Sequence, residues 1–146
     1  MLAETKARAV AADHPGSVVI GADQLLEYDR RLLHKVDDMA AARRQLRELR
    51  GRTHSLHSGI ALVQHDQVVW SSVETATLTM RDFSDDELDT TLALEGNAVL
   101  ASVGCYRLEG PSIRLFERIR GDYFTILGLP LLPLLSALRQ FAPDLL

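Results

Sequence analysis

The short run Ser17-Val18-Val19-Ile20, whose last three residues are β-branched, most constrains how this chain folds. Its continuous apolarity is typical of a strand that is covered on both faces. The pattern before it, over residues 2–13, predicts a helix that His14-Pro15-Gly16 ends. We expect the chain to leave the sheet at Gly21-Ala22-Asp23. Asp23 would then lie at the carboxyl edge of the sheet, where open α/β folds bind ligands.

Helical and strand patterns alternate along the remaining chain, which predicts an α/β domain with a mixed sheet rather than separate all-α and all-β parts. In chain order we expect a hairpin over 24–33 that turns at Tyr28-Asp29-Arg30, a helix capped by Asp37 or Asp38 that ends before Gly51, strands over 53–63 and 68–80, a helix from Ser84 to about Leu94, an apolar segment over 99–103, a strand over 113–119 and a terminal helix over 130–141.

Bulk properties exclude several classes of protein. The net charge of −4 lacks the electrostatic footprint of a protein that binds long nucleic acid. The single cysteine, Cys105, allows no intrachain disulfide, which favours a reducing cytoplasm. The apolar run over 126–135 is interrupted by Pro130 and Pro133 and is about half the length that a membrane span needs. The charged N-terminus lacks the features of a signal peptide.

Asp23 is the leading candidate for chemistry, because an acidic residue at a sheet edge can bind a ligand or act as a base. Phosphate chemistry also needs cations that neutralise the substrate oxygens. Lys6, Lys35 and Arg52 lie near the ends of expected elements, from which their side chains could converge. The structural alternatives are a turn or capping aspartate and three solvated surface charges.

Other reactive residue types carry weaker hypotheses. His54 and His57 would point to opposite faces of a strand, and no third ligand with standard spacing accompanies them. Cys105 lies in an apolar setting without a clear activating histidine, as expected for an inert buried thiol. Neither a P-loop nor a glycine-rich dinucleotide motif is present.

Five blocks in order resemble the signatures of the Maf, or septum-formation, family: Leu2-Ala3-Glu4-Thr5-Lys6-Ala7, Val19-Ile20-Gly21-Ala22-Asp23, Arg50-Gly51-Arg52-Thr53-His54, Gly121-Asp122-Tyr123 and Gly128-Leu129-Pro130. The resemblance implies one Maf-like domain over residues 1–146, with a two-lobed, inosine-triphosphatase-like α/β fold and a twisted mixed sheet flanked by helices. It also implies a cytoplasmic enzyme that hydrolyses nucleoside triphosphates to monophosphate and pyrophosphate with Mg²⁺ or Mn²⁺, and it suggests a homodimer.

The same resemblance implies roles for individual residues. Asp23 corresponds to the family's proton acceptor and would also contact the metal, while Lys6 resembles the lysine of the L-A-x-x-K-A helix. Lys35 matches a family lysine whose flanking glycine and proline are here His34 and Val36. Arg52, in the Arg-Gly-Arg-Thr-His block, is expected to bind substrate. Together these residues would hold and cleave a triphosphate.

Two further positions resemble those that govern substrate choice in the family. Gln24 and Glu109, the latter within Leu108-Glu109-Gly110, resemble the 7-methyl-GTP subgroup rather than the pyrimidine subgroup, and Leu115-Phe116-Glu117-Arg118 points the same way. A carboxylate can accept hydrogen bonds from guanine N1–H and its exocyclic amine, which thymine and uracil cannot match. The resemblance therefore implies a purine preference.

Family members begin with a strand and a loop of the S-x-S-x-R-R type, and this chain starts downstream of both. We therefore expect an N-terminally truncated Maf-like domain with weaker stabilisation of transition-state charge. The alternative function is a catalytically impaired protein that binds nucleotides in a regulatory role. A third hypothesis is an α/β interaction domain without a ligand.

Overall fold

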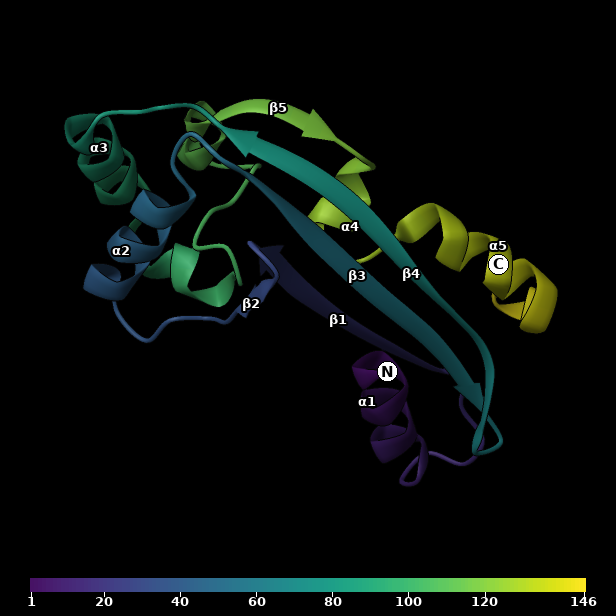
Figure 1. Cartoon of the computed structure of the whole chain (residues 1–146). Coiled ribbons are helices and arrows are strands. Elements are labelled where there is room, and N and C mark those ends of the chain that lie inside the picture. Colours follow the sequence, from purple (N-terminus) through teal and green to yellow (C-terminus); the bar gives the residue numbers. More distant parts are fainter. The chain divides into compact units, whose positions relative to one another are not determined.

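The computed structural model describes the whole chain, Met1–Leu146. Five strands and five α-helices are joined by short turns and three 3₁₀ segments (Figure 1). The elements are α1 Leu2–Ala11, β1 Val19–Tyr28, β2 Arg31–Leu33, α2 Met39–Leu49, β3 Thr53–Gln64, β4 Gln67–Met80, α3 Asp85–Glu95, η1 Gly96–Ala101, η2 Pro111–Leu115, β5 Phe116–Arg120, α4 Tyr123–Leu127, α5 Leu131–Phe141 and η3 Pro143–Leu145.

Local capping signals position α2 and α3 as the sequence predicts. The side chain of Asp38 accepts a hydrogen bond from the backbone N–H of Ala41 at 2.8 Å, which begins α2. Ser84 caps α3 in the same way through the N–H of Glu87 at 3.1 Å. Neighbouring residues also determine where the two helices end. Gly51 and Gly96 follow α2 and α3 with φ of +69° and +64°, a region that favours glycine.

The expected strand end at Gly21-Ala22-Asp23 is wrong. β1 continues without a break to Tyr28, so Asp23 lies inside a strand of ten residues. Gly21 is needed for a different reason: a β-carbon there would lie 2.1 Å from the carbonyl oxygen of Ala3 in α1. Ile20 is 46% exposed, so the strand is not covered on both faces either. The glycine therefore marks close helix contact rather than an exit from the sheet.

The five strands form one sheet in the order β2-β1-β3-β4-β5. The predicted turn after Tyr28 is confirmed, and Asp29 and Arg30 both have positive φ. β1 pairs with β2 and β4 pairs with β5 in antiparallel register. The strand expected from position 113 begins only at Phe116, because Pro111–Leu115 forms a 3₁₀ segment, and another 3₁₀ segment occupies the start of the apolar stretch at 99–103.

The chain divides into two compact units, and β1, β3 and β4 contribute residues to both. The first unit comprises residues 1–24, 57–75 and 122–146. In this unit α1 packs against Val19 and Val63, and α5 packs against Ile60 and Leu62. Because side chains alternate along β3, these two helices cover opposite faces of the strand.

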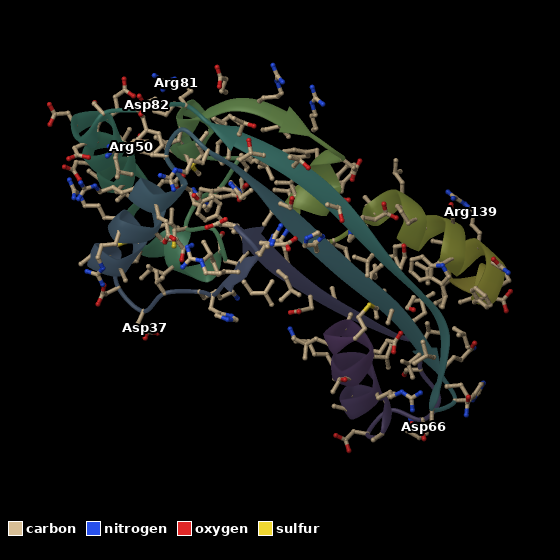
Figure 2. The ribbon with its side chains drawn as sticks, viewed as in Figure 1. Asp37, Arg50, Asp66, Arg81, Asp82 and Arg139 are labelled. Carbon is tan, nitrogen blue, oxygen red and sulfur yellow. The ribbon has the colours of Figure 1, made fainter.

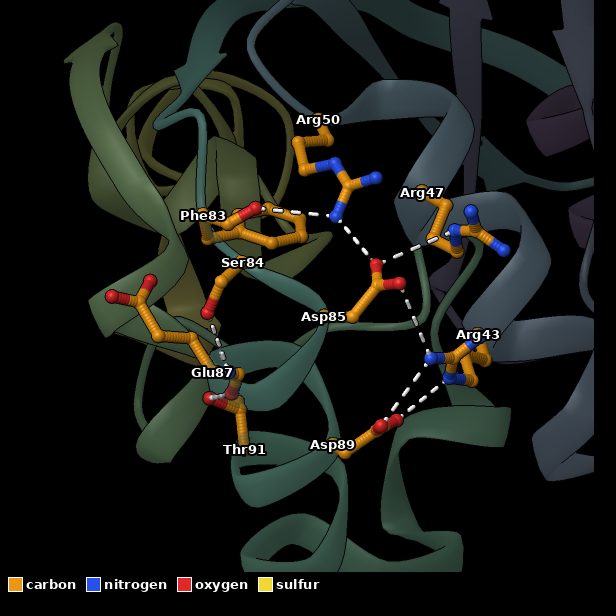
Figure 3. A network of polar contacts seen from close by, with 9 residues as sticks. All are labelled: Arg43, Arg47, Arg50, Phe83, Ser84, Asp85, Glu87, Asp89 and Thr91. Carbon is orange, nitrogen blue, oxygen red and sulfur yellow. Dashed lines mark hydrogen bonds and ion pairs between the residues drawn. The ribbon is translucent and has the colours of Figure 1, made fainter.

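The second unit comprises residues 25–56 and 76–121 and contains α2, α3 and β5. Charged side chains join its two α-helices (Figure 3). Arg50 donates to Asp85 at 2.7 Å, and Arg43 donates to Asp89 at 2.6 Å. Hydrogen bonds from these arginines lower the pKa of both aspartates. No helix of the chain combines the length and apolarity required to span a bilayer.

Candidate active site

Asp23 and Lys6 form the centre of the candidate site in the first unit. The ammonium of Lys6 donates a hydrogen bond to Oδ1 of Asp23 at 2.9 Å. The Asp23 side chain is 16% exposed and that of Lys6 is 53% exposed. Close packing of α1 on Gly21 brings the helix near enough for this pair to form. The site therefore presents a partly covered carboxylate beside a solvent-accessible cation.

The neighbouring residue Gln24 connects β1 to α4. Its amide nitrogen donates to the carbonyl oxygens of Ile126 at 2.9 Å and Thr125 at 3.1 Å, and it lies 3.2 Å from Oγ of Ser58. Ser58 donates to the same Thr125 carbonyl at 2.7 Å. Both N–H groups of the Gln24 amide are thus engaged in hydrogen bonds with carbonyl oxygens. Only its side-chain oxygen is left for a substrate, and its role in substrate choice stays a prediction.

In the second unit, Arg52 follows Gly51 immediately before β3. Its guanidinium donates to the hydroxyl of Tyr28 and lies 6.0 Å from the centre of the Tyr28 ring. This contact orients an otherwise exposed cation. Lys35 is exposed in the irregular segment 34–38 between β2 and α2.

Glu109 lies at an exposed turn whose base is held by a buried carboxylate, Glu95. Glu95 accepts hydrogen bonds from Nε of Arg107 at 2.8 Å and from both the backbone N–H and the hydroxyl of Ser112 at 3.0 Å. Burial raises the pKa of Glu95, but these donors outweigh burial and hold the pKa below its ordinary value. The carboxylate anchors both ends of the turn. A β-carbon on Gly110 would lie 2.5 Å from its Oε1.

The structure brings together only part of the predicted site. Lys6 on α1 and Asp23 on β1 are in contact, and Gln24 follows Asp23 on β1. Lys35, Arg52 and Glu109 belong to the second unit, and their convergence with Asp23 stays a prediction. Sequence reasoning missed Glu95, because a glutamate at the end of a helix shows no local sign that residues 107 and 112 will surround it.

Cys105 and His54 do not contribute a reactive centre. Cys105 is buried, as predicted, and burial raises the pKa of its thiol to about 11. His54 is 2% exposed, and its Nε2 lies 2.7 Å from the hydroxyl of Tyr106. Burial lowers the pKa of His54 to about 4. The chain contains no group of three or more His, Cys, Asp or Glu side chains arranged to hold a metal ion.

Comparison with known proteins defines the class of this chain. Residues 1–141 match the family described as Maf-like protein, and the chain belongs to that family. It is 55% identical over 139 residues to the 7-methyl-GTP pyrophosphatase of Rhizobium meliloti, a match that covers 95% of this chain and 70% of the relative. The nucleoside triphosphate pyrophosphatase of Nitrobacter winogradskyi is 54% identical over 139 residues, with 95% and 69% covered. The 7-methyl-GTP pyrophosphatase of Brucella abortus is 49% identical over 140 residues, with 96% and 70% covered.

Proposed function

We propose that this chain is a nucleoside triphosphate pyrophosphatase, a hydrolase that cleaves the α–β phosphoanhydride. Water and the triphosphate become a nucleoside monophosphate and pyrophosphate. The contact between Lys6 and Asp23 carries the proposal, since it joins a carboxylate to a cation at a position that is open to solvent. The names of the two classes of relatives support the same reaction.

Asp23 is the proposed general base. Its carboxylate accepts a proton from the water that attacks the α-phosphorus. The bond between the α-phosphorus and the oxygen that bridges it to the β-phosphorus then breaks, and pyrophosphate leaves. The ammonium of Lys6 has three donors, so it can hold Asp23 and also contact a phosphate oxygen. It thereby orients the base and offsets the negative charge that develops on the phosphates. Arg52 and Lys35 are proposed to bind the phosphates as well.

A divalent cation fits this residue set. Mg²⁺ is commonly bound through one or two carboxylates, with water and substrate phosphates as its other ligands. Asp23 has one oxygen bonded to Lys6 and a second that contacts no protein donor, and the second would hold the ion. When bound, the cation neutralises charge on the phosphate oxygens. The choice between Mg²⁺ and Mn²⁺, a cytoplasmic location and a homodimer remain proposals from the resemblance.

We propose 7-methyl-GTP as the preferred substrate. Glu109 is an exposed carboxylate on a turn that the Glu95 contacts make rigid, as recognition of a guanine edge requires. Glu109→Gln should reduce kcat/KM for 7-methyl-GTP about tenfold or more relative to UTP, because an amide nitrogen would replace an acceptor. Equal kcat/KM ratios in the variant and the wild type would remove Glu109 from this role.

Release of pyrophosphate from a panel of nucleoside triphosphates tests the reaction. Asp23→Asn should lower kcat about 10²–10⁴-fold, the usual contribution of a general base. Asp66→Asn is the matched control, because it replaces a carboxylate with an amide in the exposed turn between β3 and β4 (Figure 2). No pyrophosphate from any nucleotide, or full activity in Asp23→Asn, would contradict the proposal.

A further inference from the structure

A second group of cations, Arg118 and Arg120, lies on β5 in the second unit, and neither arginine has a role in the site described above. In the antiparallel register Arg118 is opposite Thr79, and Arg120 is opposite Thr77. Residues directly opposite each other share a face of the sheet, with β-carbons about 4.5–5.5 Å apart. Thr53 joins the same group, because its hydroxyl lies 2.9 Å from that of Thr79.

These five residues line one hollow of about 210 Å³. That volume exceeds the roughly 30 Å³ share of a single water molecule, but it is below the range of about 300–1,000 Å³ for pockets that take drug-sized ligands. The hollow therefore suits a small ion or one end of a larger ligand. Its lining contains three hydroxyls and two guanidiniums, and no carboxylate.

The two guanidiniums are unpaired, unlike most arginines of this unit. Arg118 and Arg120 have no ion-pair or hydrogen-bond partner. Glu117 lies at a β-bulge, where the pairing passes from Arg118 to Phe116, and it is not among the residues that line the hollow. By contrast, a carboxylate contacts Arg31, Arg43, Arg47, Arg50, Arg81 and Arg107. The two arginines place like charges on one face of the sheet, and no carboxylate of the protein neutralises them. An anion from solution could therefore neutralise them.

We propose that the hollow lined by Thr53, Thr77, Thr79, Arg118 and Arg120 is a binding site for an oxyanion of the phosphate class. Guanidinium groups match phosphate oxygens with paired N–H donors, and threonine hydroxyls donate to the remaining oxygens. Because β5 is an edge strand, its arginines also discourage pairing with another chain. Edge protection alone needs neither the hydroxyls nor a hollow.

Calorimetric titration with inorganic pyrophosphate, in metal-free buffer of constant ionic strength, tests the site without any turnover. Pyrophosphate is also a product of the proposed hydrolysis, so the dependence of binding on the two arginines, and not binding alone, reports this site. The double variant Arg118→Gln/Arg120→Gln should bind pyrophosphate about tenfold more weakly or worse, since each removes a charge-assisted donor. The control Arg8→Gln/Arg139→Gln makes the same charge change at exposed sites on α1 and α5 and should bind like the wild type. Figure 2 shows Arg139 on α5.

Lys6→Gln removes the cation of the Asp23 site, so the loss of affinity that Arg118→Gln/Arg120→Gln causes should persist when it is measured in the Lys6→Gln background. Thr77→Val, which preserves the shape of the side chain, should weaken binding through loss of one hydroxyl. A second titration, with a nucleoside triphosphate and the Asp23→Asn protein, identifies the source of the phosphate. If pyrophosphate binds and the arginine variant weakens this binding, the ligand of the hollow is a free anion. If only the nucleotide binds in an arginine-dependent way, the ligand is the phosphate tail of the nucleotide. The proposal is overturned if neither ligand binds at millimolar concentration, or if the arginine double variant binds both as the wild type does.

Discussion

Gly21 lies so close to Ala3 that a β-carbon at position 21 would be 2.1 Å from the Ala3 carbonyl oxygen. Gly21→Ala must therefore displace α1 from β1, and overpacking of this kind typically costs about 1–3 kcal/mol. We expect a lower Tm together with reduced hydrolysis, because α1 carries Lys6. Gly16→Ala is the control, since a β-carbon at Gly16 meets nothing within 4 Å. Equal Tm values for both variants, measured by circular dichroism, would contradict this packing.

Lys6→Gln should reduce activity without a matching loss of stability. An exposed ion pair contributes about 0–1 kcal/mol to folding, so the Tm should change little. Loss of the charge that orients Asp23 and contacts phosphate should lower kcat/KM about tenfold or more. Arg8→Gln, also exposed on α1, should leave both quantities near wild type. Steady-state kinetics with parallel thermal melts would reject the role of Lys6 if turnover is unchanged.

His54 should make the folded state sensitive to acid. Burial lowers its pKa from 6.5 to about 4, so between these values the unfolded chain binds a proton that the folded chain does not. The free energy of unfolding therefore rises with pH across this window and falls as the pH drops from about 6.5 towards 4, by about 3 kcal/mol at most. Urea denaturation at several pH values measures the slope. His54→Gln should flatten it, while His65→Gln, at an exposed turn, should not.

Glu95→Gln should alter substrate selectivity through the turn that carries Glu109. The variant replaces a buried carboxylate that accepts from Arg107 and Ser112 with a neutral amide, so the turn should loosen. We expect KM for 7-methyl-GTP to rise several-fold with kcat less affected, which separates positioning from a general loss of structure. Asp66→Asn provides the control, because Asp66 is exposed at the turn between β3 and β4. Identical KM values in the two variants would argue against this role for Glu95.

The sequence by itself determined the features that depend on neighbouring residues. Asp38 and Ser84 begin their helices, and Gly51 and Gly96 follow the helix ends, through contacts within a few positions along the chain. The motif blocks likewise identified the family and nominated Asp23. These signals are local, so they can be recognised in the sequence without knowledge of the fold.

Only the tertiary structure decided features that join distant segments. It revealed that Gly21 admits a helix instead of ending a strand, and that Glu95 receives donors from residues 107 and 112. Strand register decided that Arg118 and Arg120 share a face with Thr79 and Thr77. A shift of one residue in that pairing would move every side chain to the other face, so no reading of β5 alone could have predicted the group.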